Sequence, residues 1–206
     1  MKRQSLQNSS APSRQQLRRE LLAARKALSA AEREDAARAV QSQLASLTEL
    51  QKPCAIGSYY SVHAELPTHT LNHFLQQQGH QLALPVLHPV VHHHLLMLQV
   101  DEHSTWRHND YAIPEPELQC HRIIPLQQLT ILLVPLVGFD TKGNRLGMGG
   151  GFYDRTLAAW RNGRYPNLHP IGLAYDCQQV ESLPVEAWDI PLPRVITATK
   201  LWDFRS

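Results

Sequence analysis

The fold is decided by Leu132–Asp140, LLVPLVGFD, and by Gly143–Arg155, GNRLGMGGGFYDR, which follows it almost directly. An apolar run of strand length leads into a glycine-dense turn, and this turn opens into a helix that begins with a tyrosine and an aspartate. Continuous apolar strands are typical of parallel sheets that are buried on both faces. Strand and helix patterns alternate after residue 53, so the sequence predicts an α/β fold with right-handed crossovers.

The glycine-dense turn has the composition of a phosphate-binding site. Four of the five positions from Gly147 to Gly151 are glycine, which permits positive φ and lets successive amides point into one hollow. The helix N-terminus adds unpaired N–H groups, and Arg145 adds a planar, charged group that suits phosphate. The alternative is a tight strand-to-helix connection. The turn is not a P-loop, because no Gly-Lys-Ser/Thr follows, and it lacks the third glycine of a dinucleotide fingerprint.

The composition is that of an ordinary soluble protein with one core. The chain has 206 residues, 43% hydrophobic and 18% charged, which suits a single α/β domain. A net charge of +2 gives no reason to expect a nucleic-acid partner. No apolar segment is long enough to span a membrane. Cys54, Cys120 and Cys177 are far apart and odd in number, so we expect reduced thiols and a cytoplasmic location.

Hydrophobic patterning divides the chain into elements. Residues 1–12 are polar, which predicts a disordered tail ahead of a single domain over residues 13–206. Periodicity predicts helices at about 14–28, 29–47, 68–78 and 153–160, and strands at 54–60, 81–86, 95–100, 131–135, 170–174 and 195–198.

The first predicted helix carries both an apolar face and a basic flank. Its apolar face is expected to comprise Leu17, Leu21, Ala24 and Leu28. Beside that face, Arg14, Arg18 and Arg25 fall within a narrow arc. Two interpretations stay open: a solvated flank that pairs with carboxylates, or a helix that lends Arg14 and Arg18 to a phosphate group. Ser29 and Glu32 predict a capping box at the start of the second helix.

Three acidic residues stand where a ligand site is expected. Glu65 follows the strand at 54–60, and the carboxyl ends of parallel strands are where α/β proteins bind ligands. A carboxylate there can accept hydrogen bonds from the N–H-rich edge of a heterocycle. Asp154 follows the glycine turn and Asp189 precedes the last predicted strand, so both are candidates to hold Mg²⁺ beside nucleotide phosphates. The alternatives are an exposed loop residue at Glu65, favourable dipole placement at Asp154 and a turn at Asp189.

The histidine-rich segment does not predict a metal site. His88 and the run His92–His94 would alternate between the two faces of a strand, so they do not converge on one ion. The sequence also contains no GxSxG, no HExxH and no plausible Cys/His nucleophile pair.

The stretch Pro135–Arg155 closely resembles the signature of the 5-formyltetrahydrofolate cyclo-ligase family. Further pieces match in order: the helix with Arg14, Arg18 and Arg25, Tyr60 with Glu65, Leu84-Pro85-Val86, Ile113-Pro114-Glu115-Pro116, and Leu183-Pro184-Val185 leading to Asp189. The resemblance extends over about residues 13 to 200, and the glycine-rich block is highly specific.

The resemblance implies a three-layer α/β/α protein with a mostly parallel central sheet. It implies conversion of 5-formyltetrahydrofolate to 5,10-methenyltetrahydrofolate, ADP and phosphate, with ATP as co-substrate and Mg²⁺ as cofactor. We expect a monomeric enzyme that acts on small molecules. By position, the ATP contacts would be Arg14, Arg18, Arg145, Leu146, Gly147, Met148, Gly149, Gly150, Gly151, Phe152 and Tyr153. The folate site would comprise Tyr60, Glu65, Tyr111, Met148, Gly149, Gly150, Gly151 and Phe152. Asp154 and Asp189 would hold magnesium, and Arg145 would be catalytic.

Three positions depart from the family pattern. Arg14 replaces the usual lysine, which keeps the charge but changes the geometry. Tyr111 stands where some relatives have tryptophan. Gly150 replaces a lysine found in some eukaryotic members, so other cations must cover the phosphates.

The implied chemistry suits these residues, since it needs no side-chain nucleophile. Phosphorylation makes the poor leaving oxygen of the formyl group a good one, and the tethered N10 then closes the ring. Glycine-loop amides, Arg145 and Mg²⁺ would stabilise the transferred phosphoryl group, while Glu65 would orient the pterin. Two alternatives remain: a non-catalytic folate- or nucleotide-binding regulator, and a sugar-phosphate isomerase that needs a general base and no ATP.

Overall fold

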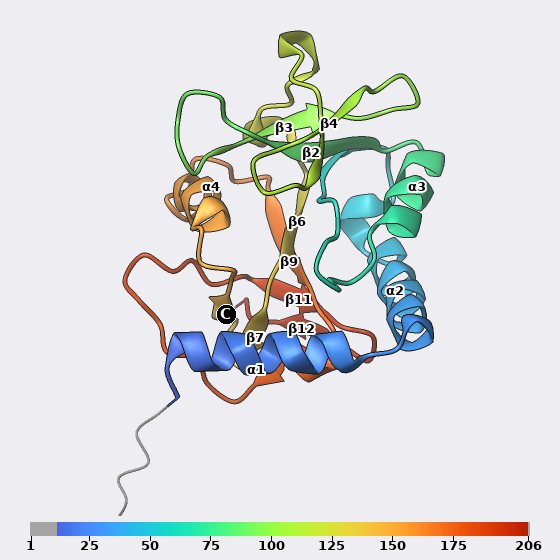
Figure 1. The fold of residues 1–206 in the computed structure, drawn as a ribbon. Coiled ribbons are helices and arrows are strands. Elements are labelled where there is room, and N and C mark those ends of the chain that lie inside the picture. The colour runs from blue at the N-terminus through green and yellow to red at the C-terminus, as the bar shows by residue number, and fades with distance from the viewer. Residues whose placement is uncertain (1–11, 206) are drawn as a thin grey trace, which may run out of the picture.

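The computed structural model describes residues 12–205 (Figure 1). The predicted disordered tail therefore lies, except for its last residue, outside the described residues. The four α-helices are α1 (Arg14–Ala27), α2 (Ala30–Ala45), α3 (His69–Gln77) and α4 (Phe152–Arg161). Short 3-10 helices occur at Thr48–Leu50, Cys120–Arg122, Leu126–Gln128 and Asp176–Gln178. All four predicted helices are confirmed to within about two residues at each end.

A seven-stranded sheet forms the centre of the molecule. Its strands, in spatial order, are β12 (Leu201–Asp203), β11 (Arg194–Ile196), β9 (His169–Leu173), β6 (Ile131–Pro135), β1 (Ala55–Gly57), β2 (Gln81–Leu87) and β3 (Leu95–Gln99). The five inner strands are parallel, and the edge strands β12 and β3 are antiparallel to their neighbours. The prediction of a mostly parallel sheet is confirmed.

The strand order reverses direction between β1 and β6. From β1 the chain proceeds to β2 on one side, whereas from β6 it proceeds to β9 and β11 on the other. In open α/β sheets, ligands bind outside the carboxyl ends of the strands at such a switch point. The fold therefore indicates where a substrate site should lie.

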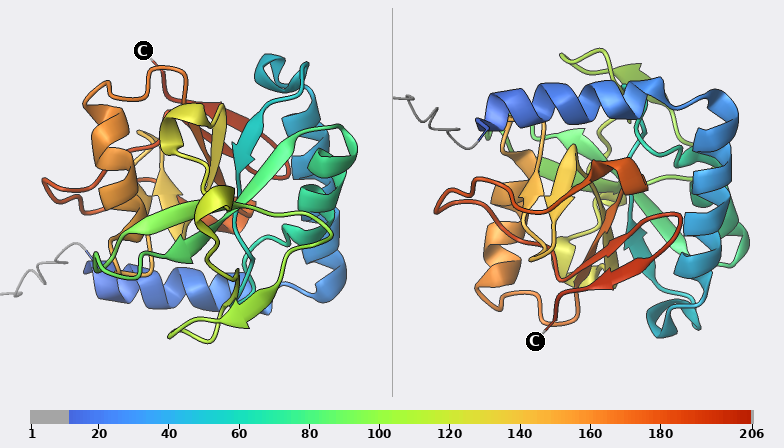
Figure 2. Two further views of the ribbon diagram at one scale, coloured as in Figure 1. Left: turned by 90° about the horizontal axis from the view of Figure 1, so that it is seen from above. Right: turned by 90° about the horizontal axis from the view of Figure 1, so that it is seen from below.

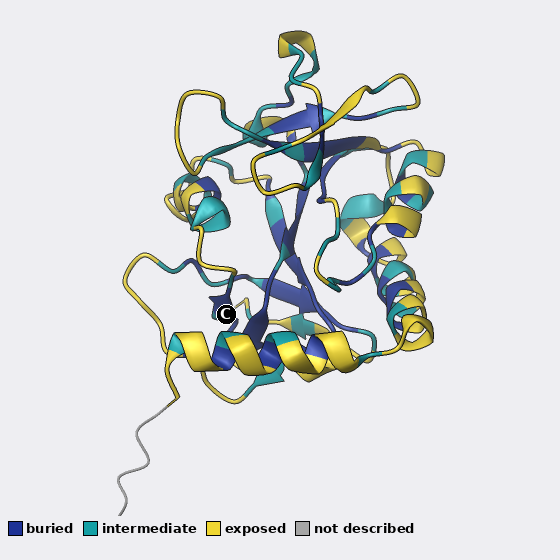
Figure 3. Cartoon of the chain, viewed as in Figure 1, coloured by how far each residue is buried: buried dark blue, intermediate teal, exposed yellow. Residues whose placement is uncertain are grey.

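Helices cover both faces of the sheet, as the prediction of three layers requires. Helices α2 and α3 pack on one face around Val40 and Leu71, and α4 packs on the other through Leu157 (Figure 1, Figure 2). Most of the central strand β6 is dark blue in Figure 3, since four of its five residues are buried. None of the helices in residues 12–205 has the length and apolar character needed to cross a membrane.

A small second sheet separates β6 from α4, which the sequence analysis did not predict. The apolar run ends at Pro135, and a hairpin of β7 (Gly138–Asp140) and β8 (Arg145–Leu146) follows, paired with β10 (Gln179–Val180). The buried carboxylate of Asp140 closes the hairpin turn by accepting hydrogen bonds from the amides of Lys142 and Asn144. The predicted direct strand-to-helix connection is therefore wrong. A further two-stranded arm, β4 (Trp106–His108) with β5 (Pro114–Pro116), was also missed.

Helix α1 lies across the carboxyl end of β6 and packs on the small sheet (Figure 1). Leu17 and Leu21 are buried as predicted, but Ala24 is exposed and Arg25 is buried in its place. Arg25 faces inward because its guanidinium donates to two backbone carbonyls, those of Leu136 and His63. The capping box that begins α2 is confirmed.

Candidate active site

A cavity of about 1140 Å³ opens at the carboxyl ends of β1 and β6. It therefore lies at the switch point of the sheet. The predicted site residues that line it are Arg14, Arg18, Tyr60, Glu65, Tyr111, Arg145, Gly147, Met148, Gly149, Gly150, Gly151, Phe152, Tyr153, Asp154 and Asp189. Residues that are up to 175 positions apart in the sequence thus share one cavity.

Leu146 is the one predicted site residue that does not line this cavity. Its side chain is buried between α1 and the small sheet, in a cluster with Leu17, Leu21 and Val137. The structure therefore does not bring the Leu146 side chain to the other predicted ATP contacts, since this side chain holds the hairpin beneath α1. Its carbonyl accepts a hydrogen bond from the amide of Val137.

The glycine loop presents backbone amides to the cavity. Gly149 (φ 104°) and Gly151 (φ 70°) adopt left-handed backbone conformations that other residues rarely take. Within residues 12–205, the amides from Gly147 to Gly151 donate no hydrogen bond to another protein group. The N-terminus of α4 follows at Phe152 and adds further free N–H groups. This loop has the donors and the local positive charge that an anion requires.

Arg145 and Asp154 form an ion pair at the floor of the cavity. The Nη2 atom of Arg145 lies 2.5 Å from Oδ1 of Asp154, and the two side chains are 3% and 22% exposed. Burial lowers the pKa of Arg145, while the neighbouring carboxylates oppose that shift. The Nε of Arg145 is buried without a hydrogen-bond partner in the described chain. The guanidinium therefore keeps donor capacity after Asp154 has been satisfied.

Helix α1 contributes two arginines that behave differently. Arg14 forms a bidentate ion pair with Asp189 and also donates to the carbonyl of Pro184. Burial acts to raise the pKa of Asp189, but hydrogen bonds from Arg14 and from the Glu186 amide outweigh it and hold this pKa below its usual value. Arg18 instead donates from Nε to the carbonyl of Gly147 at 2.7 Å. The basic flank of α1 is therefore directed at the site rather than at solvent.

The carboxylates of Asp154 and Asp189 differ in how many of their oxygens are free to bind magnesium. Oδ1 of Asp154 accepts from Arg145 and from the Ile190 amide, whereas its Oδ2 accepts from no group in residues 12–205. Both oxygens of Asp189 accept from Arg14. The described residues contain no group of three or more His, Cys, Asp or Glu that could hold an ion alone. This arrangement fits an ion held mainly by phosphates and water, with Asp154 as its protein ligand.

Glu65 lies on the opposite side of the cavity, in the loop after β1. Its Oε2 accepts from the amide of Val62 at 3.0 Å, and its carbonyl accepts from the hydroxyl of Tyr175 at 3.0 Å. Burial raises the pKa of Glu65 above its usual value, although Val62 and Arg25 oppose the shift. Glu65 is therefore a half-buried group held in place, not the exposed loop glutamate of the alternative interpretation.

The loop that carries Glu65 has an unusual backbone. His63 (φ 50°) and Ala64 (φ 61°) both adopt left-handed conformations without being glycine. Nη2 of Arg25 donates to the carbonyl of His63 at 2.9 Å and so ties this loop to α1. Such strain persists only where surrounding contacts over-determine it. Arg25 therefore helps to fix the loop that carries Glu65.

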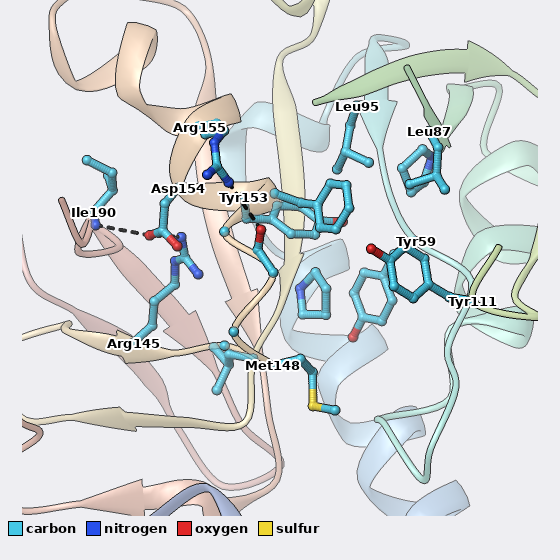
Figure 4. A pocket seen from close by; sticks show the side chains of 18 of the residues that line it. Tyr59, Leu87, Leu95, Tyr111, Arg145, Met148, Tyr153, Asp154, Arg155 and Ile190 are labelled. Carbon is cyan, nitrogen blue, oxygen red and sulfur yellow. Dashed lines mark hydrogen bonds and ion pairs between the residues drawn. The ribbon is translucent and has the colours of Figure 1, made fainter. Parts of the chain in front are cut away.

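Aromatic side chains also line the cavity, among them Tyr60, Tyr111 and Phe152. Tyr111 and Phe152 meet edge to face at 5.9 Å, and Tyr60 meets Trp106 of the β4–β5 arm at 6.2 Å. Figure 4 shows Tyr59 and Tyr111 on one side of Tyr153, with Arg145 and Asp154 on the other. Tyr59 was not among the predicted site residues, although it lines the cavity and is almost fully buried. Only its place at the carboxyl end of the predicted strand 54–60 could have marked it.

Tyr153 also lines the cavity, between the loop and Phe152 on one side and Asp154 on the other in sequence. Its hydroxyl is buried, and it has no hydrogen-bond partner in the described part of the chain. Burial and the nearby Glu65 carboxylate raise its pKa, while Arg145 opposes the shift. The hydroxyl is therefore a protonated donor between the acidic and the basic side of the site.

The fold and the cavity define a class of protein: an open α/β protein that has a glycine loop with free amides and an aromatic, acidic pocket at the switch point. The chain belongs to the 5-formyltetrahydrofolate cyclo-ligase family, whose sequence profile matches residues 10–198. The family prediction is thereby confirmed.

Individual relatives agree with this membership. The 5-formyltetrahydrofolate cyclo-ligase of Haemophilus influenzae is 45% identical over 179 residues, which is 87% of this chain and 94% of the relative. That of Escherichia coli K12 is 46% identical over 149 residues, 72% of this chain and 80% of the relative. The solved structure of Aquifex aeolicus 5,10-methenyltetrahydrofolate synthetase superimposes with a TM-score of 0.79 at 28% identity, covering 94% and 93% of the two chains.

Proposed function

We infer that this chain is an enzyme that converts 5-formyltetrahydrofolate to 5,10-methenyltetrahydrofolate with consumption of ATP and release of ADP and phosphate. One observation carries this conclusion: a single cavity joins a glycine loop with free amides to an aromatic pocket with a held carboxylate. Two ligands of different chemistry can therefore meet inside it. Relatives that are 45% and 46% identical over the aligned residues are 5-formyltetrahydrofolate cyclo-ligases, which supports the same reaction here.

The nucleotide is proposed to bind on the glycine-loop side. Its terminal phosphates would accept hydrogen bonds from the amides of Gly147–Gly151, and Arg145 would neutralise charge on the transferred phosphoryl group. Arg18 already contacts the carbonyl of Gly147, so it supports the loop and adds positive charge beside it. Magnesium at Asp154, when bound, would orient the phosphates and offset their charge.

The folate is proposed to bind on the Glu65 side. The Glu65 carboxylate would accept hydrogen bonds from the N–H groups at the pterin edge, while Tyr60, Tyr111 and Phe152 would cover its faces. Because Glu65 is partly shielded from water, a charge-assisted hydrogen bond made there is less screened than one made at the surface. This side of the site would therefore orient the substrate and leave the chemistry to the phosphates.

The reaction then follows from positioning. A lone pair of the formyl oxygen attacks the γ-phosphorus, the bond from phosphorus to the β,γ-bridging oxygen breaks, and ADP leaves with that electron pair. N10 next attacks the formyl carbon, the carbon–oxygen bond breaks, phosphate leaves, and the N10 proton passes to water. Because N10 is tethered close to that carbon, ring closure is effectively intramolecular. Arg145 and the loop amides stabilise the charge that is transferred.

The test is turnover of the purified full chain, followed through the absorbance of the methenyl product. Formation of product that requires ATP, Mg²⁺ and 5-formyltetrahydrofolate together supports the proposal. Binding of both ligands without product would instead support a non-catalytic regulator. Isomerisation of a sugar phosphate without ATP would support the second alternative, which needs a general base that these contacts do not suggest.

We further propose that the protein acts as a monomer in the cytoplasm. Both sides of the cavity are built from one chain. Cys54, Cys120 and Cys177 are free thiols, as is usual in a reducing compartment. Light scattering at assay concentrations, with and without both substrates, tests the monomer.

A further inference from the structure

The turn from Glu186 to Ile190 is tied to the phosphate side of the cavity. The Glu186 amide donates to Oδ2 of Asp189 at 2.8 Å, and the Asp189 amide donates back to the Glu186 carbonyl at 3.0 Å. Ile190 donates from its amide to Oδ1 of Asp154 at 3.3 Å. Trp188 precedes Asp189 directly, so its backbone is held beside the two ion pairs of the site.

Trp188 is unusually exposed for its residue type. Its side chain is 67% exposed, yet it lines the same cavity as the glycine loop. Ala158 and Arg161 of α4, with Asn162 directly after the helix, also line the cavity. Tryptophan is highly buried on average, so a large indole kept open on an anchored turn points to a ligand that covers it.

We propose that Trp188 is the stacking platform for the nucleobase of ATP, in a subsite between the Glu186–Ile190 turn and helix α4. This inference rests on the proposed use of ATP. The phosphates would occupy the glycine loop, and the Glu65 side is assigned to the folate, so the base must extend the other way. Figure 4 shows Ile190 and Asp154 on the side of Tyr153 that is opposite to Tyr59. The base therefore extends toward the turn that carries Trp188.

Stacking of a nucleobase on the Trp188 indole is physically reasonable at this location. Aromatic side chains bind bases through their π-faces, and removal of one such platform weakens binding appreciably. Arg161 and Asn162 would supply polar contacts at the edge of the base or to the ribose.

Tryptophan fluorescence tests the contact directly. We expect a non-hydrolysable ATP analogue with Mg²⁺ to quench the emission of the full chain, and Trp188→Phe to abolish most of the quenching. Trp106→Phe should retain it, since Trp106 lies against Tyr60 on the other side of the site. Inorganic triphosphate carries no base, so it should compete with the analogue without quenching.

Steady-state kinetics give a second, independent readout. Trp188→Ala should raise the KM for ATP by about tenfold and leave the KM for 5-formyltetrahydrofolate and kcat nearly unchanged. Trp188→Phe, which keeps an aromatic face, should restore most of the ATP affinity. Val185→Ala is the matched control, because Val185 is an exposed apolar residue of the same segment that does not line the cavity.

The outcomes separate this inference from the proposed function. An unchanged KM for ATP in Trp188→Ala, or a change confined to the folate, would overturn the stacking role while turnover of the unaltered chain still supported the reaction. Quenching through Trp188 in a chain that makes no product would sustain the subsite and overturn the reaction. Absence of both quenching and product would overturn both.

Discussion

Arg145→Met removes the guanidinium of Arg145 and keeps a side chain of comparable length, so it separates the charge from the packing. Arg145 is almost fully buried, and its Nη2 bonds to Asp154 at 2.5 Å. Removal of one preorganised charge-stabilising donor costs about 10²-fold or more in kcat, which corresponds to about 2.7 kcal/mol of transition-state stabilisation. We expect a loss of that size, with smaller changes in KM because the loop amides still hold the ground-state phosphates.

The same substitution has a predictable effect on stability. It removes a hydrogen bond between charged groups, which contributes about 1.5–3 kcal/mol, but Asp154 keeps the Ile190 amide and some contact with solvent. The free energy of unfolding should therefore fall by no more than that amount, and the protein should remain folded. Denaturant unfolding monitored by circular dichroism measures this change and shows that lost turnover does not reflect lost structure.

Arg38→Met is the matched control for both measurements. Arg38 forms a comparable ion pair with Asp35 on helix α2, but those side chains are 67% and 69% exposed. Exposed pairs of this kind contribute about 0–1 kcal/mol, and this one is remote from the cavity. Turnover of Arg145→Met within about threefold of the unaltered chain, or an equal loss in Arg38→Met, would refute the role assigned to Arg145.

Three further predictions concern the Glu65 side of the site. Because burial raises the pKa of Glu65, the folded chain binds this proton more tightly than the unfolded chain. The free energy of unfolding should therefore fall as the pH rises through the interval above the ordinary glutamate pKa. Glu65→Gln should remove that part of the pH dependence of the melting temperature. Arg25→Met leaves the His63 carbonyl without its donor, whereas the Leu136 carbonyl keeps a second one, so denaturant titration should show a loss of about 1–3 kcal/mol. Tyr153→Phe removes a buried hydroxyl that has no partner within residues 12–205, so the melting temperature of this variant should be unchanged or higher. A marked decrease would contradict this prediction, because it would mean that the hydroxyl makes a stabilising hydrogen bond.

Much of the fold was predictable because it depends on local periodicity. The strand Ile131–Pro135 was predicted to the residue, since a short apolar run can be buried on both faces only in an interior strand. The capping box of Ser29 and Glu32 was equally clear, because it is an interaction between near neighbours. The family signature added the three-layer arrangement, which periodicity alone does not specify.

The features that were missed depend on short elements or on distant partners. Strands β7 and β8 have three and two residues, too few for alternation to be recognised. A helical pattern assigns Ala24 to the core before Arg25, because it ranks side chains by apolar character. Arg25 is buried instead because backbone carbonyls 38 and 111 positions away accept its N–H groups, and sequence periodicity contains no information about them.

The ion pairs of the candidate site were also not predictable from the sequence. The predicted phosphate ligands Arg14 and Arg145 are paired with Asp189 and Asp154, the two predicted magnesium ligands. The sequence alone could not reveal these pairs, because Arg14 and Asp189 are 175 positions apart. Two arginines and two aspartates sum to no net charge, so the ion pairs avoid the large cost of an unpaired buried charge.

That neutrality bears on how a nucleotide would enter. Magnesium-bound ATP brings a cation and several phosphate oxygens together, so each arginine can exchange a carboxylate for a phosphate while a carboxylate gains the metal. Arg145 and Asp154 lie beside the free loop amides and need little movement for this exchange, whereas Arg14 must first release both oxygens of Asp189. Asp154 is therefore the stronger candidate for the first metal ligand, and Asp189 is in a position to act mainly by holding Arg14 and the Trp188 turn.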